Sequence, residues 1–374
     1  MNILFFTEQW VNGGVTSFIM NILRNMDPID DIFIDVCVSE DMTDIYDDEL
    51  KTLGVYKYVL TGKERLNPLL RLRRSASELK RLLSKRKYDI VHFHLCNTLG
   101  IYYAKIARSH GCKTIVHSHN SGSNSKFKNV VNYLLKYLFR NVPDRRFACS
   151  DFAAKWLFLD KYFRTGEVEI IKNGIDLNRF VFDEAKRKKT RAEIGVKDEI
   201  VICHIGRYIR QKNHDFLIDI YNVIYSKCGS NAKLLLIGEG PFESQIWEKA
   251  KMFGLCNSII RISNTHDIPN YLCAADVFVL TSFFEGFPVV GIEAQANGLP
   301  CVFSDEITSQ VKLLPSTVFL SLSDSSEKWA TTIMREYLQA GNRCDANKIL
   351  MVNGYHIGDV VRKLVDCYYN IMRI

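Results

Sequence analysis

Two carboxylates in the second half of the sequence, Glu285 and Glu293, flank a short segment that contains glycine and proline. A strand that ends before Glu285 and a helix over residues 289–297 would make this segment a turn. The backbone N–H groups of residues 286–290 would then lie at the N-terminus of the helix, where a phosphate or a sugar hydroxyl can bind. Near the start of that helix, Glu293 could accept two hydrogen bonds from a ribose.

Two cations, Arg207 and Lys212, stand five residues apart after another apolar run. On a loop that leaves a strand, they could clamp a diphosphate from both sides and stabilise the charge on a departing nucleoside diphosphate. Such a pair taken alone would more often be surface charge. Their place ahead of the carboxylate pair favours the diphosphate role.

Glycines and histidines follow apolar runs in the first half of the sequence. Gly13 and Gly14 would let the backbone approach a ligand, or would simply make a tight turn. The pairs His92-x-His94 and His117-x-His119 each end a predicted strand, so both members of a pair share one face. Metal binding is one interpretation of such pairs, and a place beside a ligand is another.

All these residues lie where predicted strands end. The predicted strands are residues 3–6, 32–38, 89–94, 114–117, 199–204, 233–237, 259–262, 277–280 and 300–303, with amphipathic helices between most of them. This alternation predicts two parallel, doubly wound α/β sheets. Ligands of such sheets bind beyond the carboxyl ends of the strands. Two facing Rossmann-like domains would therefore hold a site in the cleft between them.

Length and composition agree with two globular domains. The chain has 374 residues, of which 47% are hydrophobic and 24% charged, and this length exceeds one typical core. We expect one domain over residues 1–180, a second over 181–352, and a C-terminal helix over 353–374 that returns to the first domain. Eleven cysteines without a Cys-x-x-Cys motif are typical of reduced thiols. The N-terminus lacks a signal-peptide pattern, so we expect a cytoplasmic protein.

Two basic segments, residues 63–87 and 126–146, interrupt an otherwise balanced charge distribution. The second mixes Lys and Arg with Leu, Tyr and Phe, as does a helix that lies on an anionic membrane. About half of its apolar side chains would then belong to the core. A solvated helix face is the alternative for both segments. A peripheral position at the inner face of the plasma membrane therefore stays open, and we expect no nucleic-acid partner.

The sequence resembles the family 4 retaining glycosyltransferases of the GT-B fold over nearly its whole length. The most specific parts of the resemblance are the Glu285-x7-Glu293 pair and the phrase that runs from Glu293-Ala294 to Gly298-x-Pro300. The Gly-Arg…Lys-Asn phrase that contains Arg207 and Lys212 is a third part. The segments around His117 and His119 look most like bacterial capsular or exopolysaccharide glycosyltransferases.

The resemblance implies a role for each candidate residue. Glu285 would contact the transferred sugar, Glu293 would bind the nucleotide ribose, and His119 would lie near the transferred sugar, with His117 as the second choice. The residues implied in catalysis are Glu285, His119, Arg207 and Lys212. Those implied in donor binding are Gly14, Arg207, Lys212, Ile262, Glu285, Gly286, Phe287, Pro288, Val289 and Glu293. Main-chain groups of residues 262–264 would face the nucleobase. No Asp-x-Asp triplet occurs, so we expect no catalytic metal and no cofactor.

The resemblance also implies a reaction. A retaining enzyme would move a hexose from a nucleoside-diphosphate sugar, most commonly a UDP-sugar, to a glycan or lipid-linked acceptor in surface polysaccharide biosynthesis. Two alternatives stay open. A nucleotide-sugar 2-epimerase shares the two-domain architecture and needs no acceptor, and a non-catalytic protein would only bind the nucleotide sugar.

Overall fold

The chain forms two compact units in a computed structural model that describes residues 1–26, 31–62, 67–120, 122, 126–263, 265 and 267–373. Unit 1 comprises Met1–Gly174 and Ile357–Ile374, and unit 2 comprises Ile175–His356. The chain thus leaves unit 1 six residues before the expected limit at residue 180 and returns to it after His356. Each unit has its own hydrophobic core.

Unit 1 contains a seven-stranded parallel sheet in the order β3-β2-β1-β4-β5-β6-β7. Its strands are β1 (Asn2–Trp10), β2 (Phe33–Asp41), β3 (Lys57–Val59), β4 (Ile90–Leu95), β5 (Lys113–Ser118), β6 (Arg145–Ala148) and β7 (Val168–Ile170). Its helices are α1 (Gly14–Asn25), α2 (Asp47–Thr52), α3 (Pro68–Lys85), the 3₁₀ turn η1 (Thr98–Gly100), α4 (Ile101–Ser109), α5 (Lys126–Leu138), α6 (Asp151–Leu157), α7 (Asp160–Arg164) and α15 (Ile357–Met372).

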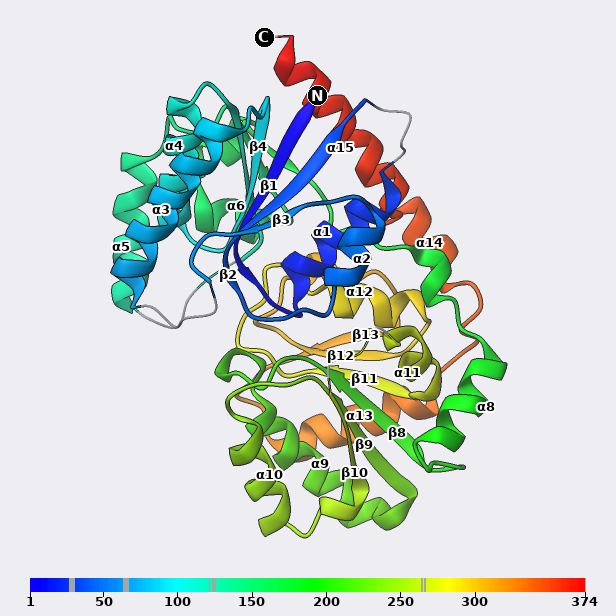
Figure 1. Ribbon diagram of the computed structural model, residues 1–374. Coiled ribbons are helices and arrows are strands. Elements are labelled where there is room, and N and C mark those ends of the chain that lie inside the picture. Colours follow the sequence, from blue (N-terminus) through cyan, green and yellow to red (C-terminus); the bar gives the residue numbers. More distant parts are fainter. Residues whose placement is uncertain are drawn as a thin grey trace. The chain divides into compact units, whose positions relative to one another are not determined.

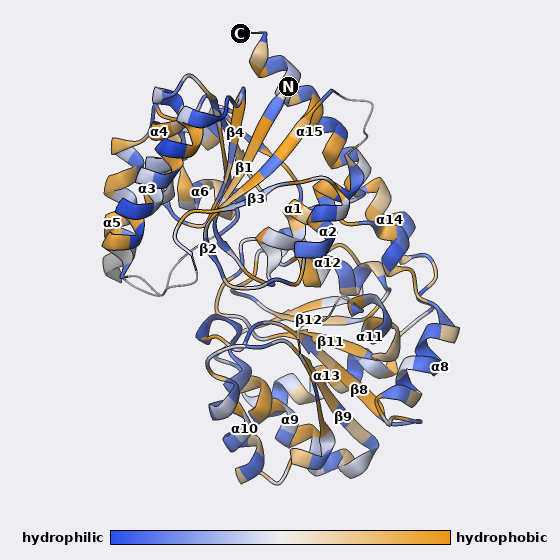
Figure 2. Ribbon diagram, viewed as in Figure 1, coloured by the Kyte–Doolittle hydropathy of each residue, from blue (hydrophilic) through white to orange (hydrophobic). Residues whose placement is uncertain are grey.

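Helices cover both faces of this sheet (Figure 1), with α1, α2 and α15 on one face and α3, α4 and α5 on the other. A sheet covered on both faces needs strands that are apolar throughout rather than alternating. Figure 2 shows this pattern as orange strands between helices that carry one polar side. All six residues of β4 are buried, and two of them are histidines.

Helix α15 completes the core of unit 1 although it is last in the sequence. Its buried residues Ile357, Leu364 and Tyr368 pack with residues of β1 and α1. The expected C-terminal segment began at residue 353, whereas α15 begins at Ile357.

Unit 2 contains a six-stranded parallel sheet in the order β10-β9-β8-β11-β12-β13. Its strands are β8 (Ile200–Ile205), β9 (Ala232–Ile237), β10 (Ile259–Ile262), β11 (Val277–Leu280), β12 (Cys301–Ser304) and β13 (Thr317–Leu320). Its helices are η2 (Leu177–Phe180), α8 (Glu184–Glu193), η3 (Arg210–Lys212), α9 (His214–Cys228), η4 (Gly229–Asn231), α10 (Glu243–Met252), η5 (Cys256–Ser258), α11 (Ile268–Ala274), α12 (Val289–Ala296), η6 (Ser309–Val311), α13 (Ser326–Leu338) and α14 (Ala346–Val352).

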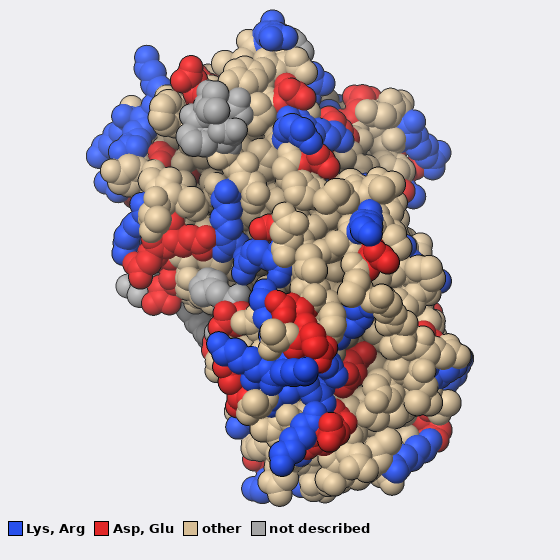
Figure 3. All heavy atoms as spheres, turned by 90° about the vertical axis from the view of Figure 1, so that its right-hand side faces the viewer, with Lys and Arg blue, Asp and Glu red and all other residues tan. Residues whose placement is uncertain are grey.

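Charged side chains of both signs are interspersed on the face drawn in Figure 3. Within the described parts of the chain, no helix combines the length and the apolar character that crossing a membrane requires.

Candidate active site

The proposed diphosphate-binding and sugar-binding residues meet at one edge of the unit 2 sheet. Strands β8 and β11 are parallel neighbours, so the loops that follow them leave the sheet side by side. Lys212 Nζ, after β8, donates a hydrogen bond of 2.6 Å to Glu285 Oε1, after β11. The two side chains are only 15% and 11% exposed. Two residues that lie 73 positions apart in the sequence thus form one buried ion pair.

Further hydrogen bonds hold the two loops together. Gln211 Nε2 donates to the carbonyl of Phe284 at 2.8 Å, and the N–H of Phe283 donates to the carbonyl of Gln211 at 2.8 Å. The hydroxyl of Thr281 donates to the carbonyl of Asn213 at 3.0 Å. These contacts fix the position of Lys212 before any ligand arrives.

The chain reverses sharply between Lys212 and α9. Asn213 has a φ of 54° and is the non-glycine residue of the described chain with a positive φ. Asparagine tolerates this left-handed conformation better than most residues do. The Asn of the Lys-Asn phrase therefore has a backbone role that aims Lys212.

Close packing beside this loop requires glycine at Gly238 and Gly240. A Cβ at Gly240 would lie 2.6 Å from the carbonyl oxygen of Tyr208, and one at Gly238 would lie 2.3 Å from that of Gly206. These glycines let the loop after β9 pack closely against the loop after β8.

Three aromatic rings under the loop were not predicted from the sequence. His214 stacks on Tyr208 at 4.5 Å between centroids and meets His204 edge-on at 4.6 Å. His204 Nδ1 lies 2.8 Å from the carbonyl of Val279, and burial lowers the pKa of His204 to about 4. Neutral rings therefore support the loop without adding charge beneath Lys212. A single histidine within an apolar strand carries no sequence signal for this role.

Unlike Lys212, Arg207 has no carboxylate partner among the described residues. Its side chain is half-buried, and the described residues give it no ion pair. Burial lowers the pKa of its guanidinium, which means that the charged form is poorly solvated. An anionic ligand would stabilise the charged guanidinium and so offset its loss of solvation.

The segment from Gly286 to Val289 leads into α12, as predicted. No side chain caps the N-terminus of α12, and Phe287 is buried against the ring of Tyr355 at 5.7 Å. Glu293 is the fifth residue of α12, which places it in the second turn rather than the first, and it is half-buried.

Ile262 ends β10, at the outer edge of the same sheet. Its carbonyl accepts a hydrogen bond of 2.9 Å from the N–H of Gly238, so one main-chain group expected to face a nucleobase already has a partner. Asn264, in the same predicted loop, lies outside the described residues.

Gly14 and His119 belong to unit 1, where Gly14 lies in α1 and His119 packs beside it. Gly14 is the first residue of α1, whose N-terminus has no capping side chain. Gly13 has an extended backbone with a φ of −172°, and a Cβ there would meet only Val11 Cγ2, at 3.5 Å. The fold itself therefore does not demand glycine at residue 13. The ring of Phe18, on α1, lies 5.4 Å from that of His119.

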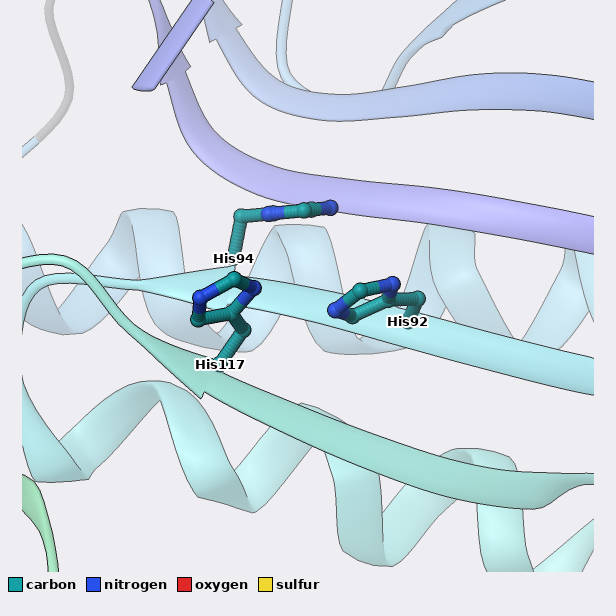
Figure 4. A group of neighbouring side chains, drawn as sticks. All are labelled: His92, His94 and His117. Carbon is teal, nitrogen blue, oxygen red and sulfur yellow. The ribbon is translucent and has the colours of Figure 1, made fainter. Parts of the chain in front are cut away.

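Four histidine rings gather at the carboxyl ends of β4 and β5. Three of them are drawn in Figure 4, and burial lowers the pKa of His92, His94 and His117 well below its usual value. His119 is half-buried, and its pKa is lowered to about 3 by burial. All four rings are therefore neutral at physiological pH.

The arrangement of these rings favours packing over metal binding. Nitrogens of His92, His94 and His117 lie within 4.8 Å of one another. The rings of His92 and His117 are nearly parallel, at 10°, and those of His92 and His94 meet at 26°. Metal ligation uses lone pairs that lie in the ring planes, whereas the ring of His92 meets those of His94 and His117 in stacked contacts.

Comparison with known proteins agrees with this two-unit architecture. A family model described as "Glycosyltransferase Family 4" matches residues 12–179, and one described as "Glycosyl transferases group 1" matches residues 186–338. EpsF of Bacillus subtilis, which is named as a glycosyltransferase, is 31% identical over 86% of this chain and 84% of its own length.

Two further relatives extend the comparison. The UDP-Gal:alpha-D-GlcNAc-diphosphoundecaprenol alpha-1,3-galactosyltransferase of Escherichia coli is 28% identical over 88% of this chain and 87% of its own length. Anabaena HepE, solved with UDP and glucose, superposes with a TM-score of 0.80 over 98% of this chain and 99% of its own, at 18% identity. The extent of the sequence match to EpsF shows that the chain belongs to the family 4 glycosyltransferases, and the likeness to HepE shows that its two Rossmann-like units are those of the GT-B fold.

Proposed function

We propose that this glycosyltransferase moves a hexose from a UDP-sugar to a glycan or lipid-linked acceptor in surface polysaccharide assembly, with retention of the anomeric configuration and without a metal ion. The observation that carries the proposal is the strand-end site of unit 2. There the Lys212–Glu285 ion pair joins the loops after β8 and β11, and the guanidinium of Arg207, on the loop after β8, forms no ion pair within the described residues. The relatives that support it are HepE, solved with UDP and glucose, and the E. coli enzyme, named for UDP-Gal and a diphosphoundecaprenol acceptor.

Each residue has a distinct proposed role. Arg207 and Lys212 bind the diphosphate, and Lys212 can do so without losing Glu285 because an ammonium has three donors. Glu285 accepts hydrogen bonds from the transferred sugar, and Glu293 accepts them from the ribose. The uncapped N-termini of α12 and α1 offer N–H groups to anionic or hydroxyl oxygens. His119 contacts the transferred sugar.

The proposed reaction is a front-side displacement. The bond between the anomeric carbon and the diphosphate oxygen breaks, and a bond forms from that carbon to the acceptor hydroxyl oxygen on the same face. The hydroxyl proton passes to the departing diphosphate oxygen. Cations fixed beforehand stabilise the charge that builds on this oxygen, so preorganisation lowers the barrier.

A donor screen tests the proposal. The protein is incubated with a panel of nucleotide sugars and with lipid-linked and free glycan acceptors, and free nucleoside diphosphate is measured. Release is expected with a UDP-sugar, and NMR of the product should show the anomeric configuration of the donor. Glu285→Gln should lose transfer but keep UDP binding, whereas Glu327→Gln, at an exposed site on α13, should behave as wild type.

Three outcomes would contradict the proposal. Tight binding without any turnover would favour a non-catalytic nucleotide-sugar protein. Conversion of the donor to its 2-epimer would favour the epimerase alternative. A product with inverted configuration would exclude the retaining mechanism.

We also propose that α5 contacts an anionic membrane, which would bring the enzyme to a lipid-linked acceptor. Val130, Leu134 and Leu138 form a stripe at a spacing of four residues and are 60%, 63% and 68% exposed. The sequence predicted that about half of the apolar side chains of this segment are core. Phe139, just after α5, is buried, whereas Tyr133 and Tyr137 on α5 are exposed as well.

Some basic residues of the segment 126–146 bind other parts of the protein, and others are exposed. Lys136 donates to the carbonyl of Lys155 at 2.6 Å, and Arg146 lies 4.1 Å from the ring centroid of Tyr162, so both serve the fold. Arg140 remains exposed. Lys63 and the side chains of Lys126 and Lys128 lie outside the described parts of the chain. The apolar stripe is therefore the stronger support for membrane contact.

Co-sedimentation with vesicles tests the membrane contact. Binding is expected to vesicles that contain anionic phospholipid, and the double variant Leu134→Ser with Leu138→Ser should weaken it at least about tenfold, since each buried leucine contributes about 1.5–3 kcal/mol. Leu338→Ser, in the exposed part of α13, is the matched control. Equal binding of the wild type and the double variant would contradict the contact.

A further inference from the structure

The ring of His94 contacts the ring of His119 directly. His94 Nδ1 and His119 Nε2 are 3.0 Å apart, and the two rings are stacked with centroids 5.2 Å apart. A neutral imidazole carries one N–H and one lone pair. One ring must therefore donate and the other accept, and the donor decides the tautomer of both.

The surroundings of His94 decide the direction of this hydrogen bond. The His94 side chain is 1% exposed, and its other nitrogen, Nε2, has no hydrogen-bond partner among the described residues. With the proton on Nε2, a buried N–H would be left without an acceptor, which native proteins rarely allow. With the proton on Nδ1, only a buried lone pair is left unpaired. The second arrangement costs less, so His94 Nδ1–H donates to His119 Nε2.

We propose that His94 is a positioning residue that fixes the tautomer of His119, so that His119 presents a neutral Nδ1–H donor to the transferred sugar. With Nε2 occupied as an acceptor, the single proton of the His119 ring must lie on Nδ1. The ring is half-buried, so one edge can face His94 while the other remains accessible. This inference rests on the proposed contact between His119 and the sugar.

The groups around His119 keep the ring neutral as well as oriented. Phe18 of α1, His117 of β5 and His94 of β4 pack against it, at centroid distances of 5.4, 4.1 and 5.2 Å. None of these rings carries a negative charge that would stabilise an imidazolium, and burial lowers the pKa of His119 to about 3. His119 therefore donates a hydrogen bond to a sugar oxygen and does not exchange a proton with it. A fixed donor discriminates between sugars by the position of that oxygen.

The tautomer can be measured without any activity assay. The full-length protein is labelled with ¹⁵N in its nine histidines, and the ring nitrogens of His119 are assigned and observed by NMR near pH 7.5. The wild type should show His119 as the Nδ1–H tautomer. In His94→Phe the ring of His119 loses its hydrogen-bond partner, and both tautomers of His119 should be populated. In His94→Asn, whose amide can still donate from a similar position, the Nδ1–H form should again predominate.

His117→Leu is the matched control. His117 belongs to the same buried cluster, and neither of its ring nitrogens has a hydrogen-bond partner among the described residues. This variant should leave the tautomer of His119 unchanged. An Nε2–H tautomer in the wild type, or an unchanged tautomer in His94→Phe, would overturn the inference.

Kinetics then separate this inference from the proposed function. With the preferred donor, His94→Phe should lower kcat/KM by about 3- to 10-fold, the usual worth of one hydrogen bond, and His94→Asn should restore most of it. If the tautomer behaves as expected but kcat/KM does not change, the contact between His119 and the sugar is wrong while the positioning by His94 stands.

Discussion

The contact between Lys212 and Glu285 sets the chemistry of the site at the scale of single residues. A lysine held by one carboxylate is already desolvated and aimed, so it loses little conformational freedom when a diphosphate binds. Arg207 supplies the complementary case, a guanidinium that has no anion among the described residues. Lys212 is thus preorganised by Glu285, whereas the charge of Arg207 is left for an anionic ligand to balance.

Lys212→Gln should lower turnover by about 10²- to 10³-fold, the loss typical when one fixed transition-state donor is removed. Glutamine can still donate to Glu285, so the free energy of unfolding should change far less than turnover does. Steady-state kinetics and urea unfolding measure the two quantities. Lys249→Gln is the control, since Lys249 forms ion pairs with Asp215 and Asp219 and is similarly buried. If Lys212→Gln lowered the free energy of unfolding by as much as it raised the activation free energy of turnover, the diphosphate-binding role of Lys212 would be wrong.

The buried histidines should make unit 1 sensitive to acid. In the folded state the pKa of His117 lies well below 6.5, so the unfolded state binds more protons once the pH falls below about 6.5. Stability is therefore full above that pH and falls as the pH decreases, by about 1.4 kcal/mol per pH unit for each histidine that stays neutral. His117→Leu should reduce this slope by about one proton and should not destabilise the protein at pH 7.5. Urea unfolding between pH 7.5 and 5 measures how the free energy of unfolding changes with pH. The same pH dependence in His117→Leu and in the wild type would contradict the role of His117 in acid sensitivity.

At the scale of elements, buried polar contacts fix the position of α12. Gln295 accepts hydrogen bonds from the N–H groups of Leu313 and Leu314 and from the hydroxyl of Thr317, at 2.8–3.0 Å. Its amide nitrogen donates to the carbonyls of Gly291 and Val311. One side chain thus ties α12 to the segment before β13, and this arrangement holds Glu293 at the strand ends.

Gln295→Leu should lower the free energy of unfolding of unit 2 by about 2–4 kcal/mol, because several buried groups lose their partner. Urea unfolding followed by circular dichroism measures the change. Gln245→Leu, at an exposed position on α10, should change stability by less than about 0.5 kcal/mol. Similar effects of the two substitutions would show that Gln295 is not the tie described.

At the scale of the whole molecule, the two units have separate cores, and the chain crosses between them twice, near Gly174 and near His356. The last helix therefore stabilises the unit that the first residues form. This explains why residues far apart in sequence, such as Ile3 and Tyr368, share one cluster.

Leu364→Ala should destabilise unit 1 by about 2–5 kcal/mol, since Leu364 is fully buried and truncation leaves a cavity. Hydrogen exchange resolved by peptide should speed up in β1 and α1 and stay unchanged in β8 and β9. Leu338→Ala, at an exposed site, is the control. Faster exchange in β8 or β9 would mean that the two cores are not independent.

The succession of strands and helices was predictable because buried parallel strands are short apolar runs and their helices have one apolar face. The short outer strands β3, β6, β7 and β13 were missed, since three or four residues with mixed polarity give little periodic signal. The spacing of Glu285 and Glu293 was equally readable, because both carboxylates lie within one local turn and helix.

Contacts between distant segments were decided only by the tertiary structure. The ion pair of Lys212 with Glu285, the hydrogen bond from His94 to His119 and the exposure of Leu134 each depend on which strands become neighbours and which helix face meets the sheet. Local sequence encodes periodicity and turn geometry, whereas burial, partner and tautomer are properties of three-dimensional packing. The residue types of the site could therefore be found from the sequence, and their pairing and protonation could not.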